Sequence, residues 1–155
     1  MVTLTYNEIS WLWKIQPGLT YIHGANLLAG TFKFTAQYRT LEKITDSYDL
    51  VIRFTSNGIL PEVYEIKGKI ARMAKIAGTQ IGDFHVNSDG TLCMIREDKV
   101  YSIYKHGFDL KLFINHLMTH FYWISYYGIY GKEPWIAEEH GYGYLLNKLL
   151  WTKRL

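Results

Sequence analysis

Two neighbouring segments alternate apolar and polar residues with a period of two, which restricts the chain to folds that contain a sheet. The apolar positions are Phe32, Phe34, Ala36 and Tyr38 in the first segment and Tyr48, Leu50, Ile52 and Phe54 in the second. Because successive side chains of a strand point to opposite faces, each segment predicts a strand with one buried and one solvated face. A third short strand is expected at 63–66, and antiparallel hairpins are the simplest assembly for such strands.

Helical patterns lie on both sides of these strands. Thr5 and Glu8 have the spacing of a capping box, which predicts a helix over 6–15 that ends before Pro17. A longer helix is expected over 109–127, with Gly128 and Gly131 ending it. Its core face consists of Leu110, Phe113, Leu117, Phe121 and Ile124. A last short helix is expected over 142–155.

The segment 67–100 has no clear period and is expected to be irregular, because glycines interrupt it repeatedly. The predicted order is a helix, strands, an irregular segment and helices, which indicates an α+β domain. With 155 residues and no low-complexity linker, residues 1–155 are expected to form a single domain.

Composition excludes several classes of function. The net charge of +3 is too small to favour nucleic-acid binding. The one cysteine cannot form an internal disulfide, and the first residues lack a signal-peptide pattern, so we expect a cytoplasmic protein. Charged and polar residues interrupt the most apolar stretch, 110–130, so no membrane span is expected.

The segment that carries the single cysteine is the most informative part of the chain. It places Cys93 just after an Asp-Gly turn, with the amide of Asn87 nearby in sequence. A cysteine acts as a nucleophile when it is partly exposed and its thiolate is stabilised. An asparagine amide can donate a hydrogen bond to the oxyanion that forms when a thioester carbonyl is attacked. The alternative interpretation is that Cys93 is a small, buried apolar residue.

This segment resembles the active-site signature of ubiquitin-conjugating enzymes. The matching residues are His85-Val86-Asn87 and Gly90-Thr91-Leu92-Cys93. It is most similar to the prokaryotic branch, in which His-Val-Asn-x-Asp-Gly-x-x-Cys is the usual form. Two more segments resemble that branch: Leu60-Pro61-Glu62-Val63-Tyr64-Glu65, and Tyr126-Tyr127-Gly128-Ile129-Tyr130-Gly131-Lys132-Glu133-Pro134-Trp135 followed by Glu139-His140-Gly141.

The resemblance implies a fold with an N-terminal helix, an antiparallel meander of about four strands, an active-site flap and C-terminal helices. Cys93 matches the thioester cysteine, and Asn87 matches the asparagine that stabilises the oxyanion or braces the loop. His85 matches the histidine that holds the flap in shape. Val86 replaces the proline of the eukaryotic motif, and the stretch from Asn87 to Cys93 is two residues shorter than is usual there. We therefore expect Asn87 to matter less than Cys93.

The function implied is an acyl transfer without metal or cofactor. Cys93 would accept the C-terminus of a partner protein as a thioester and pass it to an amine. In bacteria, similar stand-alone proteins occur in anti-phage operons of the CBASS type, where the partner is a cGAS-like nucleotidyltransferase. A second context is an operon with a ubiquitin-like modifier, and a separate activating enzyme is a possible further partner in either.

Two rival functions remain open. One is a non-catalytic binding module of the same fold that holds a ubiquitin-like protein or a nucleotidyltransferase tail. The other is a metal-dependent hydrolase in which His116 and His120, four residues apart on the long helix, join His140 or Glu139. The plainer interpretation of His116 and His120 is two histidines on the polar face of that helix.

Overall fold

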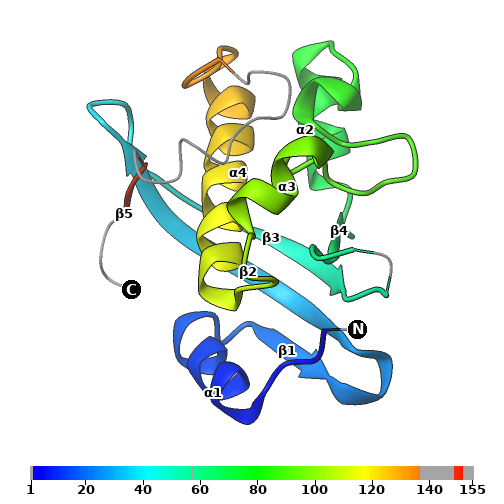
Figure 1. The fold of residues 1–155 in the computed structure, drawn as a ribbon. Helices are drawn as coiled ribbons and strands as arrows, with labels where there is room; N and C mark the ends of the chain where they lie inside the picture. The colour runs from blue at the N-terminus through cyan, green and yellow to red at the C-terminus, as the bar shows by residue number, and fades with distance from the viewer. Residues whose placement is uncertain (1, 57, 137–148, 152–155) are drawn as a thin grey trace.

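The computed structural model describes residues 2–56, 58–136 and 149–151. Within these residues the chain forms an α+β fold, with the later helices on one side of an antiparallel sheet and the first helix beside its first strand (Figure 1). The elements follow in the order α1 (Tyr6–Ile15), β1 (Leu19–Ile22), η1 (His23–Ala25), β2 (Leu27–Tyr38), β3 (Ile44–Arg53), β4 (Glu62–Glu65), α2 (Lys69–Ala77), η2 (Ile81–Phe84), α3 (Glu97–Ile103), α4 (Leu110–Tyr130) and β5 (Leu149–Trp151).

The sheet is a meander in which each strand pairs with the next. Its order is β1-β2-β3-β4, and all three pairings are antiparallel. The longest pairing joins β2 and β3, from Leu27 opposite Arg53 to Ala36 opposite Ile44. The predicted four-stranded meander is therefore confirmed, as are the strands expected around 32–38, 48–54 and 63–66. The helix expected over 142–155 is wrong for 149–151, which form β5 against Ala36–Tyr38 of β2, and its other residues lie outside the described part.

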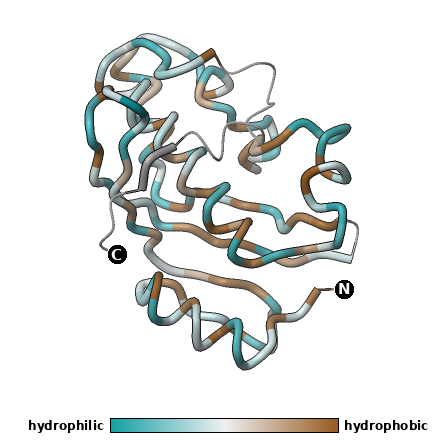
Figure 2. The backbone as a smooth tube through the Cα atoms, turned by 60° about the vertical axis from the view of Figure 1, so that its left-hand side comes forward, coloured by the Kyte–Doolittle hydropathy of each residue, from teal (hydrophilic) through white to brown (hydrophobic). Residues whose placement is uncertain are grey.

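The first helix begins and ends where the sequence predicts. Thr5 N–H donates to the Glu8 carboxylate, and Glu8 N–H donates to the Thr5 hydroxyl, which completes the capping box. Figure 2 shows apolar and polar residues alternating along this helix. Past its end, the buried side chain of Gln16 accepts from the N–H of Lys33 at 3.0 Å and donates to its carbonyl at 2.8 Å. The side-chain amide of Gln16 thus makes the two backbone hydrogen bonds to β2 that a neighbouring strand would make.

Helix α4 crosses the sheet in front of β2 and β3 (Figure 1). All five residues of its predicted core face are buried. The helix is longer than predicted, because it passes through Gly128 and ends at Gly131, whose φ of 70° suits a C-cap. A Cβ at position 128 would meet the terminal methyl group of Met73 in α2, at the far end of a flexible side chain. Gly128 thus lies inside the helix beside Met73 and does not end it.

The segment 67–100 is less irregular than predicted. Gly68 and Gly78 bracket α2, and both have the left-handed conformation, with φ of 69° and 71°. Two of the glycines that suggested an irregular loop are thus the caps of a helix. None of the helices in the described residues is both long and apolar enough to cross a membrane.

A polar network fixes α4 to the sheet and to α2. The hydroxyl of Ser125 donates to the Asp46 carboxylate at 2.7 Å and lies 2.7 Å from the hydroxyl of Tyr48. Because the single Ser125 hydrogen is directed at Asp46, Tyr48 donates to Ser125. Lys69 of α2 also donates to Asp46 and lies over the Tyr48 ring. Asp46 of β3 thus joins three elements of the fold, through Ser125 of α4 and Lys69 of α2.

Replacing Ser125 by alanine is expected to destabilise the fold by about 1–3 kcal/mol, because the Tyr48 hydroxyl and one Asp46 oxygen lose their buried partner. Urea unfolding measures this directly. The matched control is Ser102→Ala on the exposed face of α3, which should change stability by less than about 0.5 kcal/mol. Equal effects of the two substitutions would show that the network contributes nothing.

Candidate active site

Residues 85–93, which end in Cys93, fold as a tight flap alongside β4. Thr91 forms an antiparallel bridge with Tyr64, and Val86 forms one with Leu92. The N–H of Leu92 donates to the carbonyl of Val63 at 2.9 Å. The flap tip turns at Gly90, which has a φ of 90° that disfavours other residues. Backbone pairing with the sheet thus fixes where the flap lies.

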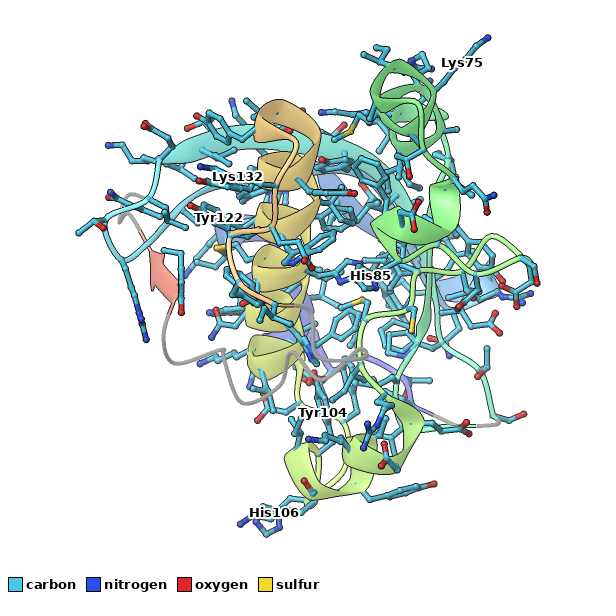
Figure 3. The ribbon with its side chains drawn as sticks, turned by 90° about the horizontal axis from the view of Figure 1, so that it is seen from above. Lys75, His85, Tyr104, His106, Tyr122 and Lys132 are labelled. Atoms are coloured by element: carbon cyan, nitrogen blue, oxygen red, sulfur yellow. The ribbon has the colours of Figure 1, made fainter. Side chains whose placement is uncertain are left out.

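The backbone of Cys93 is tied to α4 through His85. Cys93 N–H donates to the carbonyl of His85 at 2.8 Å. His85 has a φ of 61°, and its ring packs edge-on against Trp123 of α4 at 4.6 Å between centroids. Figure 3 shows His85 between the flap and α4. His85 thus links the backbone of Cys93 to Trp123 of α4.

The side chain of Asn87 braces the turn that precedes Cys93. Its amide donates to the hydroxyl of Thr91 at 3.0 Å. That hydroxyl donates in turn to the Asp89 carboxylate at 2.6 Å, and Thr91 N–H donates to the same carboxylate. These hydrogen bonds hold the pKa of Asp89 below its usual range. The amide of Asn87 is thus directed at Thr91 within the turn.

Cys93 lies on the wall of an open groove of about 380 Å³. The groove runs between the segment before β4, the flap, α3 and the start of α4. Its apolar lining is Leu60, Pro61, Leu92, Met94, Ile95, Val100 and Phe113. Its charged lining is Glu62, Asp89, Glu97 and Arg96. The thiol is partly exposed, so an extended chain lying in this groove could bring a carbonyl group to it.

Burial raises the pKa of the Cys93 thiol. The resting side chain is therefore mainly a protonated thiol at neutral pH. A cysteine activated as a stable thiolate would show the opposite shift. In an acyl transfer at this site, the proton must leave the sulfur as the carbonyl is attacked.

The interpretation of His116 and His120 as polar-face histidines is wrong, because both are fully buried. The sheet covers one side of α4, and α2, α3 and the flap cover the other, so this helix has no solvated face along most of its length. The Tyr104 hydroxyl lies 3.2 Å from Nδ1 of His116. No set of three residues able to hold a metal ion occurs in the described part of the chain, and Glu139 and His140 lie outside it.

The sequence did not suggest that Tyr104 and His116 would meet. They are twelve positions apart on different helices, and no motif or period joins them. Phe113, which also lines the groove, was predicted only as a core residue. Nothing in the spacing indicated that the start of α4 lies beside Cys93.

Comparisons with known proteins give no further support for any family. A scan against family models, a search of curated proteins and a search of solved structures each found no match.

Burial lowers the pKa of His116 from 6.5 to about 4, and this predicts acid sensitivity. Above pH 6.5 neither the folded nor the unfolded state binds a proton at this residue. Below it the unfolded chain binds one first, so stability falls until the folded-state pKa is reached, by about 3 kcal/mol in total. Urea unfolding at a series of pH values should show this loss in the wild type. His116→Gln should show less of it, and an equal loss would contradict the prediction.

Proposed function

We propose that this protein is an acyl carrier related to ubiquitin-conjugating enzymes, with Cys93 as the residue that carries the acyl group. The observation that carries the proposal is the position of Cys93. It is partly exposed on a groove wall, with its backbone N–H held by His85. The groove is open at the surface and could admit the extended C-terminus of another protein.

The order of elements supports the same relationship. A helix, a four-stranded meander, a flap with the nucleophile and a long helix behind it follow in the order that the family resemblance implies. The three residues of the resembling motif have compatible surroundings: His85 packs against α4, Asn87 braces the turn, and Cys93 faces the groove. The sequence motif and the fold order thus point to one function.

The chemistry requires an activated acyl donor. A thiol does not displace water from a free carboxylate, so the donor carries a leaving group, either AMP or the thiol of a separate activating enzyme. The Cys93 sulfur attacks the carbonyl, the S–C bond forms, the leaving group departs and the thiol proton is lost to solvent. An amine then attacks the thioester, an N–C bond forms, the S–C bond breaks and Cys93 leaves as thiolate, which regains a proton.

The family resemblance also suggests the partner. In the CBASS context, the donor is the C-terminus of a cGAS-like nucleotidyltransferase, and the second context supplies a ubiquitin-like modifier. The apolar lining of the groove suits a tail with apolar side chains.

Incubating the protein with an operon neighbour, its activating enzyme and ATP is expected to give a covalent adduct of the summed mass on a non-reducing gel. Hydroxylamine should cleave it, because thioesters react with hydroxylamine and disulfides do not. Cys93→Ala should give no adduct. Cys93→Ser is the matched control, since its hydroxyl would give an ester that resists reductant. An adduct that survives in Cys93→Ala would refute the proposal.

Asn87→Ala is expected to slow thioester formation less than Cys93→Ala, which abolishes it. Its amide bonds Thr91 within the turn, so its loss loosens the flap and leaves the sulfur in place. Rapid-quench measurement of thioester formation distinguishes the two variants. Thr91→Val removes the other partner of the same hydrogen bond and should have a similar effect. Complete loss of thioester in Asn87→Ala would instead indicate a direct role at the carbonyl.

A second candidate function is a binding module that holds the same kind of tail without transfer. The observation that favours it is the raised pKa of Cys93, which makes the resting thiol a weak nucleophile. In that case the complex with the partner would form without a covalent adduct, and Cys93→Ala would bind equally well.

A further inference from the structure

The chain enters the flap against two aromatic residues of α4 that lie one helical turn apart. Phe84, the last residue of η2, packs on Tyr127 with 4.9 Å between ring centroids. The ring of His85 packs edge-on against Trp123 at 4.6 Å. Trp123 and Tyr127 also contact each other, with their centroids 5.0 Å apart, as residues four positions apart on a helix do. The entrance of the flap thus rests on one aromatic surface of α4.

The backbone of His85 has a conformation that needs such a support. Its φ of 61° lies in the left-handed region, which is uncommon for residues other than glycine. In this conformation its carbonyl accepts the N–H of Cys93 at 2.8 Å. A return of His85 to an extended backbone would pull its ring from Trp123 and turn its carbonyl away from Cys93. The packing of this one ring therefore supports a hydrogen bond to the nucleophile.

The indole of Trp123 is fixed in turn by the segment that follows α4. Its Nε1–H donates to the carbonyl of Trp135 at 3.2 Å. The Trp135 ring contacts Tyr38, at 4.7 Å between centroids, and lies almost parallel to Tyr122 at 6.0 Å. The Tyr122 hydroxyl donates to the carbonyl of Glu42 at 2.7 Å. Trp135 is thus anchored at the end of β2 and, through Tyr122, at the loop that follows it.

We propose that Trp123 is a positioning residue for Cys93, and that Trp135 holds Trp123 in place from outside the groove. The inference rests on the proposed function, because it names residues that place the reacting sulfur. The contacts run without a break from Trp135 through Trp123 and His85 to the N–H of Cys93. Neither tryptophan is part of the groove lining. Their effect on the reaction therefore passes through the flap and not through contact with the substrate.

The side-chain type at position 123 supports a role beyond filling space. Trp123 is only 2 % exposed, and its one polar atom has an acceptor in Trp135. An aliphatic side chain would fill the same volume but would offer neither a donor to Trp135 nor a flat ring to His85. Edge-to-face packing of aromatic rings is directional, so it selects one orientation of the His85 ring. Ordinary core packing, by contrast, would contribute stability without any particular effect on Cys93.

The test separates the position of the sulfur from the stability of the core. Trp135→Leu removes the stacked ring and leaves the residues of α4, the flap and the groove as they are. Trp11→Leu in α1 is the matched control, because Trp11 is also a partly buried tryptophan packed against the core, and it lines a different cavity. His85→Gly removes the ring that contacts Trp123 but permits the left-handed backbone, since glycine adopts it readily.

These variants and the double variant of Trp135→Leu with His85→Gly are compared with the wild type. Each is measured for alkylation of Cys93 by iodoacetamide as a function of pH, for kcat and KM of thioester formation with the partner, and for urea unfolding.

Trp135→Leu is expected to change the two reactions of Cys93 in opposite directions. The alkylation profile should move to lower pH, because a loosened flap exposes a thiol whose pKa is raised by burial. Thioester formation should slow by up to about 100-fold in kcat, because the sulfur is misplaced, and KM should stay near the wild-type value, because the groove keeps its lining. Trp11→Leu should lower the urea midpoint and change neither reaction.

The double variant tests the path of the effect. In the His85→Gly background, Trp135→Leu should change both reactions much less than it does in the wild type, because the ring that joins the flap to Trp123 is already absent. Equal effects of Trp135→Leu in the two backgrounds would overturn the inference, and so would a wild-type alkylation profile in Trp135→Leu itself.

Trp123→Phe decides the question if Trp135→Leu does not fold. It keeps an aromatic ring and removes the N–H that bonds Trp135, so a shifted alkylation profile supports the inference and an unchanged one overturns it. If the wild type forms no thioester with any partner, the proposed function fails. The alkylation profiles still decide whether Trp123 and Trp135 position Cys93.

Discussion

The burial of α4 on both sides is the constraint on which the rest of the described structure depends. The sheet covers one side of this helix, and α2, α3 and the flap cover the other, so residues as polar as His116, Thr119, His120 and Ser125 are fully buried in it. Each polar group on such a helix needs a partner from a neighbouring element. Ser125 bonds Asp46 of the sheet and Tyr104 bonds His116, and these contacts determine how the layers meet.

The candidate site follows from this arrangement. The flap is positioned by backbone pairing with β4 and by His85, which packs against Trp123 of α4. Partial burial at this position raises the pKa of the Cys93 thiol. A nucleophile kept protonated until a carbonyl arrives is protected from adventitious alkylation and oxidation, which act on thiolates.

The sequence predicted the elements whose patterns are local. The capping box of Thr5 and Glu8 located α1, and period-two alternation located β2 and β3, because in each case neighbouring residues determine the structure.

Prediction failed where the structure at a residue depends on another residue far away in the sequence. Gly128 looked like a helix end because its partner, Met73, is far away in sequence. Gly68 and Gly78 looked like loop breakers, although they cap a helix of only nine residues. The motif around Cys93 was visible as a motif, but the groove and the Tyr104–His116 pair arise only when α3 and α4 come together.

The side chain of Gln16 has a consequence for the edge of the sheet. Strand β2 is much longer than β1, so its outer edge extends past the point where β1 ends. Gly18 accepts the N–H of Thr31, Gln16 occupies both backbone groups of Lys33, and β5 pairs with Ala36–Tyr38. An unpaired strand edge is a template for strands of other molecules. One glutamine amide thus interrupts the surface on which intermolecular sheets, and ultimately aggregates, would grow.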